Sequence, residues 1–197
     1  SAGITGTIGI NQTVSGSGQI IGDPAGGLIF NRGTINGNDA AVGLGIGGNH
    51  LGTGGVYRSD NGTLLLLTGL VLDGGTFESS GTGSITKDTG GIAKISNVTN
   101  NGQLNIWGKG GSIELGGTLV NNGTLSINSD NNVFNAHLRT SVDVAIGGDG
   151  VVQMTTPSDR LDAQIFTDTA VMLTIGENQT VMGSGRIGGD NDGIIEN

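Results

Sequence analysis

Several residue types that anchor or cross-link proteins are scarce or missing in this sequence. It contains no cysteine and only two prolines, and aromatic residues make up 3% of it. Without cysteine the chain has no disulfides and no thiolate metal ligands, and the scarcity of proline excludes a collagen-like triple helix. No run of apolar residues reaches the ~18 that a membrane-spanning helix needs, so we expect no membrane insertion of this segment.

Basic residues are also few. Eight Lys and Arg stand against 17 Asp and Glu, which gives a formal net charge of −9. A chain with this charge repels phosphate backbones, so we expect no nucleic-acid partner. Net negative charge also keeps glycine-rich chains apart in solution, and solubility is the simplest explanation of the acidic surplus.

Glycine and aliphatic residues dominate what is present. The chain has 41 glycines among 197 residues, yet 34% of it is hydrophobic, which is too apolar for a disordered glycine-rich tract. Short strings such as residues 103–106 and 124–127 alternate polar and aliphatic residues and end at Gly, Asn or Asp. Period-two alternation is typical of half-buried strands, and no long window has helical periodicity. The sequence therefore predicts an all-β fold.

One segment occurs twice. Residues 7–23 (TIGINQTVSGSGQIIGD) return as residues 174–190 (TIGENQTVMGSGRIGGD) with 13 of 17 positions identical, and Asn11 recurs as Asn178, an offset of 167. We interpret residues 1–197 as a single β-solenoid segment, with one long repeat over about residues 7–173 and the start of the next over residues 174–197. Preceding and following repeats, or end-to-end and lateral self-association, are the expected partners.

A finer period lies inside the long one. Aliphatic residues that we expect to point inward recur every 19 to 24 residues, at Ile20, Leu44, Leu64, Ile85, Leu104, Leu125, Ile146, Ile165 and Ile187. Turn motifs of the form Asn-Gly-x-Leu begin at Asn101 and Asn122, 21 residues apart. A coil of about 20 residues predicts a parallel β-helix, with Asn and Gly at corners that need positive φ. A β-sandwich, the alternative, normally carries more aromatic residues in its core.

Two further expectations follow from this period. Eight coils account for the 167-residue offset, so we expect both copies of the doubled segment to begin at the same angular position of the solenoid. The glycine-rich stretch of residues 42–55 is expected to be irregular or to protrude.

The strings Gly111-Ser112-Ile113-Glu114-Leu115-Gly116-Gly117 and Asn121-Asn122-Gly123-Thr124-Leu125, with the doubled NQT-V-x-GSG-x-I motif, resemble a known class of proteins. They are similar to the passenger regions of giant bacterial surface proteins, namely filamentous-haemagglutinin-like exoproteins and autotransporter adhesins. The resemblance implies a right-handed parallel β-helix at the cell surface or outside the bacterium, acting as a spacer, adhesin or matrix filament. Cell-surface glycans or matrix are further partners that it implies.

Catalytic residues are not evident in the sequence. Nothing pairs His50 with His137, and the acidic trios Asp73, Glu78, Asp88 and Asp143, Asp159, Asp162 are interpreted as solvated outward positions. We therefore expect no enzyme and no cofactor, with a carbohydrate-active β-helix enzyme as the alternative.

Calcium is the other open alternative, as a calcium-dependent adhesion module. Asp190 and Asp192 in Gly-Gly-Asp-Asn-Asp-Gly, together with Asp39 in Gly-Asn-Asp, resemble pieces of the repeats in calcium-binding solenoids. The counterpart of Asp190-Asn191-Asp192 in the first copy is Asp23-Pro24-Ala25, which lacks the second acid. We interpret all three candidates as turn residues.

Overall fold

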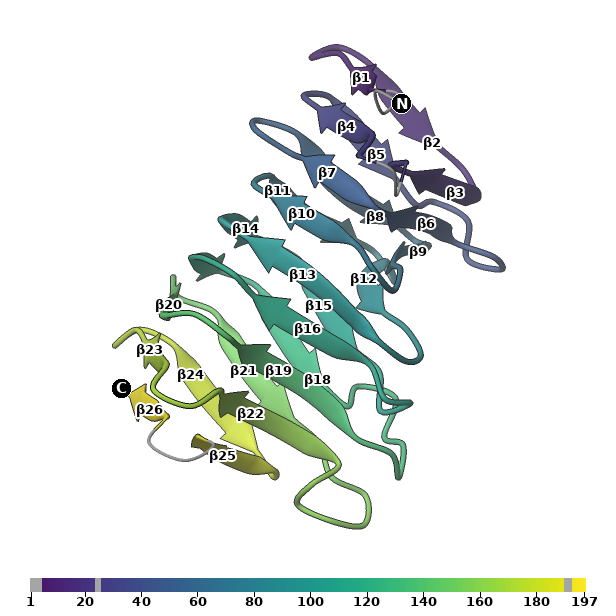
Figure 1. Ribbon diagram of the computed structural model, residues 1–197. Helices are drawn as coiled ribbons and strands as arrows, with labels where there is room; N and C mark the ends of the chain where they lie inside the picture. The colour runs from purple at the N-terminus through teal and green to yellow at the C-terminus, as the bar shows by residue number, and fades with distance from the viewer. Residues whose placement is uncertain (1–4, 24–25, 190–192) are drawn as a thin grey trace.

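The computed structural model describes residues 5–23, 26–189 and 193–197. Within these residues every regular element is a β-strand, and the strands form three parallel sheets stacked as a β-solenoid of about 8 turns with about 22 residues per turn (Figure 1). The predicted fold class is confirmed, and each turn is slightly longer than the expected 20 residues. No part of the described chain forms a helix long and apolar enough to cross a membrane.

Sheet A takes the first strand of every coil. Its nine strands, in order, are β1 (Gly6–Ile8), β4 (Leu28–Asn31), β7 (Asn49–Leu51), β10 (Val71–Asp73), β13 (Ile92–Ser96), β16 (Ser112–Leu115), β19 (Ala136–Thr140), β22 (Ala163–Thr167) and β25 (Arg186–Gly189). Neighbouring strands pair in parallel, so residues one coil apart stack in columns. One inward column contains His50, Leu72 and Ile95, all buried.

Sheet B takes the second strand of every coil. Its nine strands are β2 (Thr13–Ser15), β5 (Thr34–Asn36), β8 (Val56–Asp60), β11 (Thr76–Ser80), β14 (Val98–Asn100), β17 (Leu119–Asn121), β20 (Val144–Gly147), β23 (Met172–Ile175) and β26 (Ile194–Glu196). Ile35, Tyr57 and Phe77 form an inward column with no exposed surface. The Tyr57 and Phe77 rings meet edge to face at 6.0 Å between centroids, a favourable aromatic arrangement.

Sheet C completes each coil. Its eight strands are β3 (Gly18–Ile21), β6 (Leu44–Gly47), β9 (Thr63–Leu66), β12 (Ser84–Lys87), β15 (Gln103–Ile106), β18 (Thr124–Ile127), β21 (Val151–Met154) and β24 (Thr180–Gly183). Sheet A strands run from right to left across the front of Figure 1 while the chain descends from β1 to β26, so the coil is right-handed. This is the hand that crossovers between parallel strands favour.

The predicted column of inward aliphatics is correct in its middle and wrong at both ends. The five members from Leu44 to Leu125 pair one after another in sheet C. Ile20 pairs with Ile46 rather than Leu44, and Leu125 pairs with Val152. Ile146 lies in sheet B, and Ile165 and Ile187 lie in sheet A. Corner loops of unequal length shift the later residues to other sides, so a constant spacing fails.

The glycine-rich stretch does not protrude as a whole. Residues 44–47 and 49–51 within it form β6 and β7 of the regular coil, which corrects the expectation. The longest connections in the described chain are residues 37–43, 128–135 and 155–162. The last two lie at the corner between sheets C and A, where extra residues extend outward without breaking the strand ladders.

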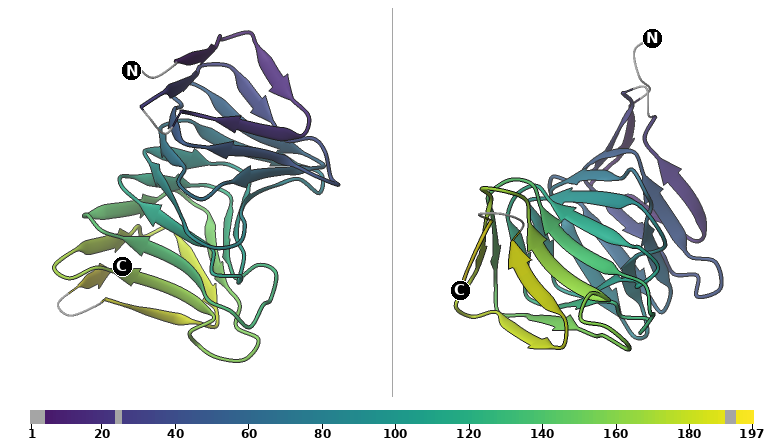
Figure 2. Two further views of the ribbon diagram at one scale, coloured as in Figure 1. Left: turned by 45° about the vertical axis from the view of Figure 1, so that its right-hand side comes forward. Right: turned by 60° about the horizontal axis from the view of Figure 1, so that its bottom comes forward.

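The doubled segment also departs from the expected register. Its first copy contributes β1, β2 and β3, in sheets A, B and C, whereas its second copy contributes β23, β24 and β25, in sheets B, C and A. The two copies lie at opposite ends of the stack (Figures 1 and 2). The 167-residue offset therefore equals seven full turns and one further strand, and the same motif occupies a different side of the solenoid each time.

Candidate functional site

One of the three calcium candidates, Asp39, lies in the described residues. Asp39 lies between β5 and β6, where its Oδ1 accepts hydrogen bonds from the amides of Val42 (3.1 Å) and Ala41 (2.8 Å), which lower the pKa of its carboxyl group. Asp190 and Asp192 lie outside the described residues. No group of three His, Cys, Asp or Glu side chains in the described part of the chain is placed to hold a metal ion. Asp39 thus has a local role in its turn.

The two histidines are far apart on sheet A. His50 is an inward residue of β7 whose Nε2 lies 3.1 Å from the carbonyl oxygen of Gly47. His137 lies on β19, four strands further along the sheet, with its ring edge-on to Phe166. Burial lowers the pKa of both rings, and Arg139 adds to the effect at His137. Both imidazoles are therefore neutral at pH 7, and they do not act together.

The acidic trios are also separated. Asp73 ends β10 in sheet A, Glu78 lies on β11 in sheet B, and Asp88 follows β12 in sheet C. In the other trio, Asp143 precedes β20 while Asp159 and Asp162 share the loop before β22. Neither arrangement brings three carboxylates to one place.

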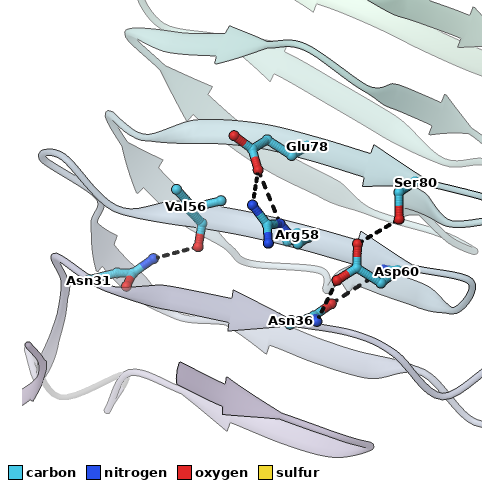
Figure 3. Close-up of polar contacts among 7 residues, drawn as sticks. All are labelled: Asn31, Asn36, Val56, Arg58, Asp60, Glu78 and Ser80. Atoms are coloured by element: carbon cyan, nitrogen blue, oxygen red, sulfur yellow. Dashed lines mark hydrogen bonds and ion pairs between the residues drawn. The ribbon is translucent and has the colours of Figure 1, made fainter. Parts of the chain in front are cut away.

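Polar side chains instead connect one coil with the next along the outer face of sheet B (Figure 3). The Asn36 amide donates to Asp60 Oδ2 at 2.9 Å, and the Ser80 hydroxyl donates to Asp60 Oδ1 at 2.7 Å. An ion pair on the same sheet joins β8 to β11, and in it the Arg58 guanidinium donates twice to Glu78 Oε2. Contacts of this kind run parallel to the axis and bind neighbouring coils together.

A charged network does the same on the outer face of sheet A. Glu114 is nearly buried between Lys94 in the coil before it and Arg139 in the coil after it. Lys94 Nζ lies 2.7 Å from Glu114 Oε1, and Arg139 continues to Asp168 at 3.1 Å. Burial raises the pKa of the Glu114 carboxyl, but hydrogen bonds from Lys94 and Ser141 outweigh it, so the net pKa is lowered.

Buried amides form a third connection, inside the corner between sheets B and C. Asn100 donates to Asn121 at 2.8 Å, so stacked Asn side chains bond between neighbouring coils. In the coil after Asn121 the equivalent position is Gly148. Gln179 lies in the coil after that, and its side chain extends past Gly148 to reach Asn121. Its Oε1 accepts from Asn121 at 3.0 Å, and its Nε2 donates to the carbonyls of Asn121 and Gly147.

Lys87 is an unusual residue of this interior. It occupies an inward position of sheet C between Leu66 and Ile106 and has no exposed surface. Its Nζ donates to the Gly90 carbonyl at 2.7 Å and to the Asp88 carboxylate at 3.2 Å. Burial lowers its pKa, and these acceptors compensate in part. The ammonium thus fixes the loop that follows β12.

The outer face of sheet C holds a groove of about 500 Å³. It extends over β12, β15, β18 and β21 and is lined by polar residues together with the half-buried Trp107. Gln103 lies at its centre, where Nε2 donates to Asn105 Oδ1 at 2.7 Å and to Ser126 Oγ at 2.9 Å. Of the twelve described residues that line the groove, none is charged.

Sequence reasoning did not find this groove. Its residues come from four coils, and the only local signal is the alternation Gln103-x-Asn105-x-Trp107, which places all three on the outward face of one strand and its continuation. Comparison with protein-family models, curated proteins and solved structures found no match to this chain. The geometry is therefore the basis for proposals about function.

Proposed function

We propose that the chain is a structural segment, a rod or spacer, of a large extracellular or cell-surface bacterial protein. The observation that carries this proposal is the continuity of its ladders, since sheets A and B each run through nine parallel strands without a break. Polar and charged side chains that would serve catalysis elsewhere are engaged between coils here, as at Asp60, Glu114 and Gln179. The resemblance to surface exoproteins supports the location.

Rod geometry makes a dimensional prediction. Paired strands are ~4.8 Å apart, so seven turns and one strand extend the axis by about 35 Å. A chain carrying the 167-residue period twice should gain about this much in maximum dimension in small-angle X-ray scattering, and oriented samples should diffract near 4.8 Å along the axis. Two periods joined by a flexible hinge would contradict the proposal.

The two alternatives differ from the rod in measurable ways. A calcium-dependent adhesion module predicts a melting temperature that rises with millimolar calcium, whereas the rod predicts no change. A carbohydrate-active enzyme predicts release of reducing ends from a polysaccharide, and loss of that release when one carboxylate is replaced. The rod requires neither result.

A further inference from the structure

The outer face of sheet C changes character along the axis. The outward column that contains Leu65 in β9 continues through Thr86 to Asn105, Ser126 and Gln153 in later coils. An aliphatic position is thus followed by four polar ones, and the last three of these, Asn105, Ser126 and Gln153, line the groove. A hollow with a polar lining and one indole is a candidate binding site.

The polar groups in the groove are organised before any ligand arrives. Gln103 is held by Asn105 and Ser126, one on its own strand and one on the next coil. No described group bonds to Asn105 Nδ2 or to the side chain of Gln153, which is exposed. The Asn105 and Gln153 amides, each able to donate and accept hydrogen bonds, therefore face the groove two strands apart, about 9.6 Å along the axis.

Charge and topology select the class of ligand. An uncharged lining in a protein of net charge −9 suits neither a phosphate nor an acidic polymer, and without carboxylates it offers no site for a divalent cation. An extended peptide would need a free sheet edge for its backbone, but β12 to β21 are interior strands of sheet C. A neutral sugar suits this lining, because its hydroxyl groups can form hydrogen bonds with the amides and hydroxyls and its ring can stack on the indole.

We propose that this groove binds a neutral oligosaccharide, with Asn105 and Gln153 donating and accepting hydrogen bonds and Trp107 contacting a sugar face. Lys109, whose Nζ lies 5.6 Å from the centroid of the Trp107 ring, orients the indole by a cation–π contact. Because glycosidic cleavage requires a pair of carboxylates and the described lining has none, the groove binds the chain without cutting it.

Trp107 gives this proposal a direct readout because it is the only tryptophan in the sequence. We would titrate the folded chain with cellotetraose, laminaritetraose, maltotetraose and N-acetylchitotetraose, and follow tryptophan emission. At least one of these probes should shift the emission saturably. A sulfated tetrasaccharide should bind more weakly than its neutral counterpart, since the residues that line the groove are uncharged and the protein has a net charge of −9.

Three variants complete the test. Gln153→Ala and Asn105→Ala should each weaken binding about tenfold, the effect of losing a hydrogen bond of ~1.4 kcal/mol. Gln19→Ala, an exposed glutamine on β3 of the same sheet but outside the groove, should bind like the parent chain. The proposal is overturned if no neutral tetrasaccharide binds, if the two groove variants bind like the parent, or if a neutral Gln- and Asn-rich peptide binds instead. The rod proposal would survive any of these outcomes.

Discussion

The two copies of the doubled segment have nearly the same sequence but different places in the solenoid. In both copies a turn closes with a hydrogen bond from the backbone N–H of the glutamine to a glycine carbonyl. Gln12 donates to Gly9 and Gln179 donates to Gly176, each at 2.9 Å. The side chains then differ: Gln12 is exposed and bonds back to the amide of Gly9, whereas Gln179 is buried and bonds to a coil two turns away. The backbone turn is thus the same in both copies because their sequences match, whereas the hydrogen-bond partners of the Gln side chain depend on where the copy lies in the solenoid.

Two of the three corners of the coil, those between sheets A and B and between sheets B and C, are chemically alike. The Asn-x-Gly motif behaves the same way at both of them. Asn31, between sheets A and B, accepts from Gly33 and donates to the Val56 carbonyl, while Asn100, between sheets B and C, accepts from Gly102 and donates to Thr124. A motif that fits either of these corners leaves the register to be set by loop lengths. A further copy of the period would begin on sheet C.

The largest expected loss of stability is at Gly148, whose missing side chain leaves room for the Gln179 side chain to reach Asn121. Its φ of 93° strains any other residue, and an added Cβ would lie 2.5 Å from the Asn121 carbonyl oxygen. We expect Gly148→Ala to lower the free energy of unfolding by about 2–4 kcal/mol through strain and the displaced amides.

Gly147 is a matched control on the neighbouring position. Its Cβ would meet nothing within 4 Å, so Gly147→Ala should change the free energy of unfolding by less than about 0.5 kcal/mol. Urea unfolding followed by circular dichroism measures both. Equal losses would mean that the Gln179 bridge has no special need for glycine.

Truncation of the two glutamines tests the same difference more directly. Gln179→Ala leaves the buried Asn121 amide and the Gly147 carbonyl short of a partner, which should cost about 1–3 kcal/mol. Gln12→Ala removes one exposed contact and should cost less than about 0.5 kcal/mol. The midpoints of urea unfolding compare the two variants, and similar shifts would contradict the positional argument.

Acid should distinguish the first coils of the solenoid from its middle. Burial lowers the pKa of His50, whose inward ring packs beneath the coils of the first copy. A base with a folded pKa below its unfolded value of 6.5 favours unfolding as it is protonated, so stability is full above pH 6.5 and falls as the pH decreases toward the folded pKa.

In the middle of the solenoid the relevant group is the Glu114 network on β16, whose lowered pKa keeps its contribution to stability until the pH falls below the ordinary value of 4.5. Hydrogen exchange between pH 7 and pH 5 should therefore show earlier opening of β4 to β10 than of β16. His50→Leu should abolish the early opening. The pKa of His137 is lowered too, but its ring is half-buried on the outer face of β19, so its protonation should open the chain less than that of the buried His50. Simultaneous opening of both regions would refute the assignment to His50.

Much of this fold could be predicted from local pattern. Alternation predicted the strands, and four of the five described non-glycine residues with positive φ are asparagines, as the corner chemistry required. The register could not be predicted, because loops such as residues 128–135 and 155–162 change the spacing while leaving the ladder intact.

The candidate site was beyond the sequence for a related reason. Asn105, Ser126 and Gln153 belong to one outward column only because β15, β18 and β21 stack in that register. No strand alone distinguishes a residue in a groove from one on a flat face. Asp39 differs because its sequence context predicts a turn residue, and its carboxylate accepts hydrogen bonds from two backbone amides of that turn.

The smallest expected effect concerns the four positions at which the copies differ. These pairs are Ile10 and Glu177, Ser15 and Met182, Gln19 and Arg186, and Ile21 and Gly188. All are exposed except Gly188, which is partly so, whereas inward residues such as Val181 are shared between the copies. Exchanging the four pairs conserves the net charge and should change the free energy of unfolding by less than about 1 kcal/mol.

Val181→Ala is the control for that exchange, because it removes inward surface packed against the core and should cost more than all four exchanges together. Thermal melting compares the variants. A large loss of stability from the exchange alone would show that the outward residues determine which side of the solenoid each copy occupies. A small loss would leave the connecting loops as the determinant, since the inward residues of the two copies are the same and fit sheet A, B or C alike.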